Sequence, residues 1–122
     1  MSDILALAYD RPFQLWAYSV SHSQLLLRSP SDKEYRTRVD VLFKNVTAML
    51  LRETYARLRV RTSHAGEETS AIRGLCGIDP GKHFTYYVIE GEPLSFVVAG
   101  SVGSVEDQGS YSDASSLFVS GL

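Results

Sequence analysis

The ten-residue stretch YRTRVDVLFK, residues 35–44, decides the fold class of this chain. Every second position is aromatic or β-branched: Tyr35, Thr37, Val39, Val41 and Phe43. The positions between them are mostly charged. A period of two with these residue types is typical of a half-buried β-strand, whereas a helix would scatter the charges around its circumference. The stretch therefore predicts a β-rich protein.

The same period recurs along most of the chain, and turn-forming clusters separate the segments. We expect about seven strands, over residues 13–20, 24–28, 35–44, 46–52, 55–61, 83–90 and 94–99. The last strand is expected to continue to residue 105, with bends at Gly100 and Gly103.

Residues 62–82 break the period and are expected to form a long loop or one short helix, Glu67–Leu75. Acidic residues suit its beginning, and Gly74 or Gly77 suits its end. Residues 108–116 are predicted to be a polar loop, and Leu117–Val119 to dock on the core. The sequence thus predicts a single all-β domain over 1–122, an antiparallel sheet folded as a sandwich or a half-open barrel.

Composition narrows the classes of function. The chain has 122 residues, of which 44% are hydrophobic and 21% charged, and its net charge is −2. This excludes a disordered tail and a generally basic nucleic-acid binder. The apolar runs are far shorter than a membrane span of about 20 residues, so no membrane association and no signal peptide are expected. A single cysteine predicts a cytoplasmic protein without internal disulfides.

Charge is segregated along the chain. Residues 28–61 have a net charge of +5, and residues 62–122 have a net charge of −6. Such halves either neutralise each other within one domain or leave a basic face for a partner.

Two rows of basic residues are the candidate partner-binding site: Arg36, Arg38 and Lys44 on one strand, and Arg57, Arg59 and Arg61 on another. If the strand over 46–52 pairs between them, both rows lie on one side of the sheet. Arginine suits contact with carboxylates and phosphates, so the partner is an acidic protein or, alternatively, a nucleic acid. The remaining interpretation is a solvated sheet face whose charges protect its edges.

Four aromatic residues form a candidate ligand cleft: Trp16, Tyr18, Tyr86 and Tyr87. A concave, partly apolar site lined by these rings would make the protein a small-ligand binder or an enzyme.

Catalytic and metal-binding patterns are weak. Cys76 lies close in sequence to Asp79 and His83, but no nucleophile signature surrounds it, so packing beside its apolar neighbours is the better interpretation. The histidines His22, His64 and His83 lack the tight ligand spacing of zinc sites. Residues 100–104 are better explained as a bulged strand than as a phosphate loop. We therefore predict no catalytic residue, no metal and no cofactor.

The order of elements resembles a group of small bacterial all-β families. The matching pieces are Phe13–Tyr18, LLLR at 25–28, VDVLFKNV at 39–46, and Tyr86–Ala99. The group includes uncharacterised domains and immunity proteins of polymorphic toxin systems. The resemblance implies a non-catalytic interaction protein, such as an immunity-type inhibitor, and assigns no residue roles.

The sequence therefore predicts a protein–protein interaction domain, with a small-ligand binder or a nucleic-acid module as alternatives. Strands that are apolar on both faces leave sheet edges that a homodimer would cover, so the partner is another protein or a second copy.

Overall fold

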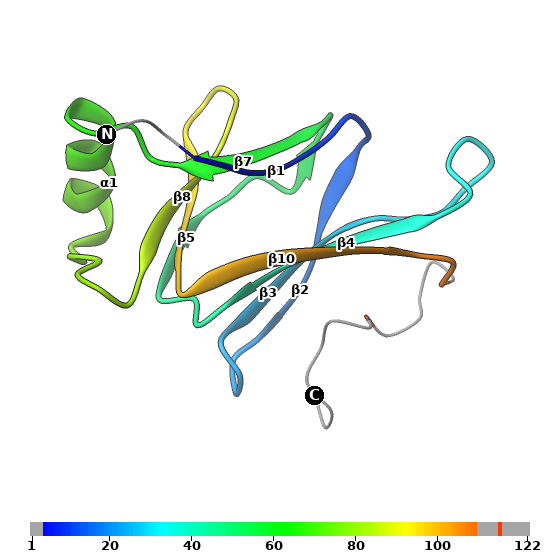
Figure 1. The fold of residues 1–122 in the computed structure, drawn as a ribbon, viewed down its shortest axis with the longest axis horizontal. Coiled ribbons are helices and arrows are strands. Elements are labelled where there is room, and N and C mark those ends of the chain that lie inside the picture. Colours follow the sequence, from blue (N-terminus) through cyan, green and yellow to red (C-terminus); the bar gives the residue numbers. More distant parts are fainter. Residues whose placement is uncertain (1–3, 110–114, 116–122) are drawn as a thin grey trace.

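The structure, a computed structural model, describes residues 4–109 and Ser115. Two antiparallel five-stranded sheets pack face to face (Figure 1). Sheet I contains, in spatial order, β1 (Leu5–Tyr9), β7 (Leu58–Thr62), β8 (Thr85–Ile89), β9 (Ser95–Ala99) and β5 (Ala48–Leu50). Sheet II contains β10 (Ser101–Asp107), β4 (Arg38–Lys44), β3 (Gln24–Ser29), β2 (Phe13–Ser19) and β6 (Thr54–Tyr55). The predicted all-β sandwich is confirmed.

The described residues form ten strands rather than the expected seven. The predicted strand over 55–61 is divided by a bend, so β6 belongs to sheet II and β7 to sheet I. The predicted strand over 94–105 is likewise divided at Gly100 into β9 and β10. Residues 5–9 add β1, which was not expected. A local period of two shows that a segment is extended, but it does not show where the chain crosses between sheets.

One bent two-stranded ribbon joins the sheets at a corner. β4 pairs with β10 in sheet II, and their continuations β5 and β9 pair in sheet I. At the bend, the Gly100 amide donates to the Lys44 carbonyl oxygen at 2.9 Å. Asn45 has a φ of 55°, and a Cβ on Gly100 would lie 3.1 Å from the Asn45 side chain. The Asn45 side chain leaves little room for a Cβ at this position, which explains the glycine.

The main core lies between the sheets. Phe13, Leu25 and Leu27 of sheet II contact a layer from sheet I that includes Val60 and Val97. All five side chains are buried, so the apolar half of each alternating strand faces the other sheet.

One helix, α1 (Glu67–Cys76), covers the opposite face of sheet I and lies beside β8 in Figure 1. Ile72 is its buried anchor and packs against Tyr86, Val88, Phe96 and Val98. The helix ends at Gly77, whose φ of 70° is left-handed and whose amide donates to the Arg73 carbonyl oxygen at 2.8 Å. Of the two alternatives expected for residues 62–82, a long loop or one short helix, the structure has the helix, ending at Gly77 rather than Gly74.

Most of the expected polar loop 108–116, and all of residues 117–119, lie outside the described residues. Within the described part of the chain, no helix is long and apolar enough to cross a membrane.

Candidate functional site

The two rows of basic residues belong to different sheets. Arg38 and Lys44 are on β4 in sheet II, whereas Arg59 and Arg61 are on β7 in sheet I. The condition for aligning both rows, a strand over 46–52 paired between them, is not met, because β5 pairs with β9 in sheet I. The six basic residues therefore do not form one face.

Acidic side chains neutralise the β7 row. Arg59 Nε lies 3.1 Å from Glu90 Oε1, and Arg61 Nε lies 3.4 Å from Glu90 Oε2. Arg61 also forms a two-point contact with Glu68 of α1, at 2.7 and 2.9 Å. The hydrogen bonds from Arg61 lower the pKa of Glu68 below its ordinary value of 4.5. Desolvation of the carboxylate opposes this shift, and the hydrogen bond from the His64 amide adds to it.

Arg38 is buried and makes a two-point contact with Asp107, with both N–O distances 2.9 Å. Acids from the C-terminal half thus neutralise Arg38, Arg59 and Arg61, which favours charge compensation within the domain. The other three candidates are exposed and have no ion-pair partner among the described residues: Arg36 in the loop before β4, Lys44 at the end of β4, and Arg57 in the bend before β7.

A second ion pair is completely buried in sheet II. Arg28 and Asp40 are both 0% exposed. Arg28 Nε lies 2.7 Å and its Nη2 lies 3.2 Å from the two oxygens of Asp40. The Arg28 guanidinium also lies 4.8 Å from the Trp16 ring centroid. These side chains alternate with core residues of β3 and β4, so they are on the face of sheet II that points away from sheet I. This pair is structural.

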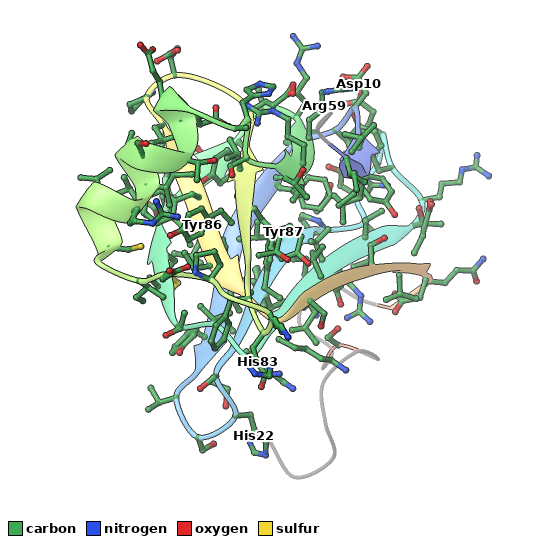
Figure 2. The ribbon with its side chains drawn as sticks, turned by 60° about the vertical axis from the view of Figure 1, so that its left-hand side comes forward. Asp10, His22, Arg59, His83, Tyr86 and Tyr87 are labelled. Carbon is green, nitrogen blue, oxygen red and sulfur yellow. The ribbon has the colours of Figure 1, made fainter. Side chains whose placement is uncertain are left out.

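The four aromatic side chains of the expected cleft do not converge. Tyr86 and Tyr87 are adjacent on β8 and point to opposite faces, Tyr86 toward α1 and Tyr87 toward sheet II (Figure 2). Trp16 contacts Arg28 on the outer face of sheet II. Only Tyr18 and Trp16 line a common cavity.

Among the described residues, Cys76 and Asp79 make only local hydrogen bonds. Cys76 Sγ lies 3.4 Å from the Ile78 amide and packs in the cluster beneath α1. Asp79 accepts a hydrogen bond from the Gly81 amide in its own turn, at 3.2 Å. Across residues 4–109 and Ser115, no cluster of three His, Cys, Asp or Glu residues is arranged to hold a metal ion.

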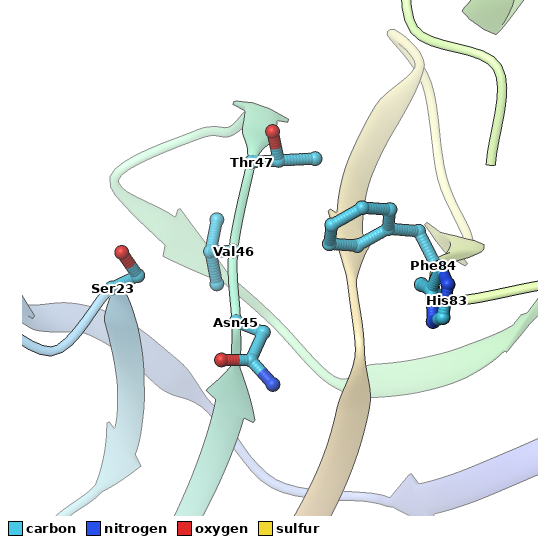
Figure 3. A pocket seen from close by; sticks show the side chains of 6 residues that line it. All are labelled: Ser23, Asn45, Val46, Thr47, His83 and Phe84. Carbon is cyan, nitrogen blue, oxygen red and sulfur yellow. The ribbon is translucent and has the colours of Figure 1, made fainter.

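A cavity of about 390 Å³ lies at the corner where the bent ribbon crosses between the sheets (Figure 3). Its lining comprises Ser23, Asn45, Val46, Thr47, His83 and Phe84. Among the described residues, no hydrogen bond joins Ser23 to His83, so they do not form a nucleophile–base pair.

A larger groove, of about 700 Å³, lies between β2 of sheet II and β5 of sheet I. Its lining comprises Leu15, Trp16, Ala17, Tyr18, Met49, Leu51, Arg52 and Glu53. Residues opposite each other in an antiparallel pair share a face. Leu15 and Tyr18 pair with core residues of β3, and Met49 pairs with Val97, so all three side chains face the space between the sheets.

These three apolar side chains are nevertheless exposed, because the groove is the open seam of the sandwich. Leu15 is 40% exposed, Tyr18 38% and Met49 41%. Of these three residues, only Tyr18 was predicted from the sequence as part of a binding site. Both have the apolar character of core residues, and only their position at the sheet edges exposes them.

Comparison with protein-family models, curated proteins and solved structures gives no match. The groove therefore has to be interpreted from its own chemistry.

Proposed function

We propose that this protein is a non-catalytic protein–protein interaction domain that binds its partner at the β2–β5 groove. The supporting observation is the exposure of Leu15, Tyr18 and Met49 on the two walls of one seam. Contiguous exposed apolar side chains with an aromatic among them are typical of protein interaction surfaces.

The charged surfaces support the same choice of site. Arg38, Arg59 and Arg61 already contact carboxylates of this chain. A partner that bound them would have to displace those contacts, whereas the groove offers apolar surface that is still in water. Apolar burial is the dominant favourable term in most protein association.

An immunity-like role is the more specific form of this proposal. It rests on the resemblance of residues 13–18, 25–28, 39–46 and 86–99 to the small bacterial all-β families. In that role the partner is a bacterial toxin domain, and co-expression of this chain would protect a cell that makes the toxin.

A small-ligand binder is the second candidate, because a groove of about 700 Å³ lies within the size range of ligand sites. The two candidates differ in what the groove variants should release. If the groove binds a protein, the groove variants should no longer capture a stoichiometric partner band on a gel. If it binds a small ligand, native mass spectrometry of the purified wild-type protein should show the added mass of the ligand, and the groove variants should lack it.

The test is a pull-down with the tagged chain from lysate of the source organism, washed at low and high salt. Tyr18→Asp and Met49→Asp place a carboxylate in the groove and should abolish capture of the partner. Leu5→Asp is the matched control, because Leu5 is a 48%-exposed apolar residue on β1, at the other edge of sheet I.

The salt washes separate the groove from the basic residues. A partner held by apolar contacts should survive high salt, whereas one held by exposed arginines should be released. Capture that persists in both groove variants, or that salt reverses and Arg57→Ala abolishes, would place the interaction elsewhere.

A further inference from the structure

Within residues 4–109, one edge of β2 is unpaired along the groove. β6 pairs with β2 only at Phe13 and Gln14, and the Leu15 amide then donates to the Glu53 carbonyl oxygen at 2.8 Å. Beyond that point, no strand in the described part of the chain pairs with Ala17–Ser19 on the side away from β3. The main chain there has unused pairing capacity.

This edge lacks the usual protection against pairing. The fifteen residues from Phe13 to Leu27 include no Asp, Glu, Lys, Arg or Pro. Natural proteins commonly block open edges with charged residues or proline, and an unprotected edge is a template for an added strand. The edge strand β10, by contrast, ends in Glu106 and Asp107.

The groove has two walls, and this limits what enters it. Leu15 and Tyr18 contribute from sheet II, and Met49 contributes from sheet I. A single extended segment can contact both walls. The β2 edge of a second copy would bring the attached β3 with it, so it would present the edge of a sheet, rather than a single strand, to the two walls.

The lining also specifies the chemistry of that segment. Its charged residues, Arg52 and Glu53, lie between β5 and β6 and are opposite in sign, so the lining carries no net charge. A lining with no net charge favours an uncharged segment over a charged one.

We propose that the occupant of the groove is one extended, uncharged segment of the partner, added as a strand to β2 at Ala17–Ser19. This inference rests on the proposed function and specifies how the partner is held. Three strand residues span about 10 Å, so three or four residues of the segment pair with β2. Side chains at alternate positions of the segment contact Leu15, Tyr18 and Met49.

The probe is a phage library of random heptapeptides, selected on the intact protein. We expect uncharged sequences with apolar residues at every second position. Selected peptides should lose at least tenfold in affinity when alternate backbone amides are N-methylated, because methylation removes the main-chain donors and keeps the side chains. Tyr18→Asp should abolish binding, and Leu5→Asp should not.

Hydrogen exchange supplies a direct readout. Peptide binding should slow exchange of one or more amides within Ala17–Ser19. Equal affinity of the methylated peptide, or unchanged exchange at these amides, would overturn strand addition. If exchange at these amides slows as the protein concentration rises in the absence of peptide, the edge pairs with a second copy of the chain. That result would also overturn the proposal.

Failure of this inference is distinguishable from failure of the proposed function. If Tyr18→Asp abolishes capture of the protein partner but no strand-forming peptide is selected, the groove binds a folded surface. In that case the interaction site stands and the extended segment does not.

Discussion

Replacing Asp40 by alanine is expected to lower the free energy of unfolding by about 3–5 kcal/mol, the cost of removing one partner from a buried ion pair. The change removes the carboxylate that contacts Arg28 through two nitrogens, at 2.7 and 3.2 Å. Since both side chains are 0% exposed, water cannot replace the lost contact.

The exposed pair Arg59–Glu90 is the matched control. It is also an arginine–carboxylate contact, at 3.1 Å, but its side chains are 48% and 36% exposed. Exposed pairs contribute below about 1 kcal/mol because solvent and salt screen them. Glu90→Ala also removes the contact with Arg61 Nε at 3.4 Å, but Arg61 keeps its two-point contact with Glu68, so the change should still cost much less than Asp40→Ala.

A double variant separates the burial of charge from the loss of packing. Arg28→Met with Asp40→Leu removes both charges and keeps apolar volume. Replacing a buried pair in this way is often neutral or stabilising, so the double variant should be more stable than Asp40→Ala alone.

Urea unfolding at 25 °C, followed by Trp16 fluorescence and by circular dichroism, measures these differences. With a slope of about 2 kcal/mol per molar urea, Asp40→Ala should lower the midpoint by about 2 M. A midpoint shift equal to that of Glu90→Ala, or a double variant as unstable as Asp40→Ala, would refute the argument that burial decides the value of this pair.

Three further predictions concern α1 and the loop before β4. Gly77→Ala should destabilise the fold by about 1 kcal/mol, because Gly77 has a left-handed φ of 70°. Gly74→Ala should stabilise the fold by about 0.5–1 kcal/mol, because alanine has the higher helix propensity and a Cβ meets open space there. Thermal unfolding of both variants measures the two effects. The pKa of Glu68 is lower in the folded state than in the unfolded state, so its ionised form stabilises the fold above about pH 4.5 and this contribution is lost as the pH falls through the folded pKa. The stability difference between wild type and Glu68→Gln, measured by urea unfolding, should accordingly shrink below pH 4.5 and stay constant toward pH 7. Arg11 donates to the carbonyl oxygens of Ser29, Pro30 and Thr37, at 3.4, 3.4 and 2.6 Å, so Arg11→Ala should speed amide exchange across residues 30–37 while leaving exchange in β8 unchanged.

The strands could be predicted from the sequence because the alternation that marks a strand involves only residues close together in the chain. The alternation over 35–44 identifies β4, although residues 35–37 belong to the preceding loop. Arg11, which is distant in sequence, holds this loop. Its guanidinium lies 4.3 Å from the Tyr35 ring centroid and donates to the Thr37 carbonyl oxygen at 2.6 Å. Such contacts leave no trace in the local period.

The candidate site was harder to predict. The basic rows stood out in the sequence, yet Arg38 and Arg61 contact Asp107 and Glu68, which come from other elements. Leu15 and Met49 gave no signal, since an apolar residue at an open seam has the same sequence pattern as one in the core. Exposure at an edge depends on the strand order, which sequence periodicity does not contain.

By itself, the sequence determined the β-rich class and the segregation of charge, and it limited residues 62–82 to a long loop or one short helix ending at Gly74 or Gly77. These follow from periodicity and composition, which act within a few residues. The tertiary structure alone decided that Arg28 and Asp40 are buried together and that acids of the C-terminal segment contact Arg38, Arg59 and Arg61. It also decided that the sandwich opens between β2 and β5. Pairing between distant strands determines which side chains water can reach, and that is a property of the assembled sheets.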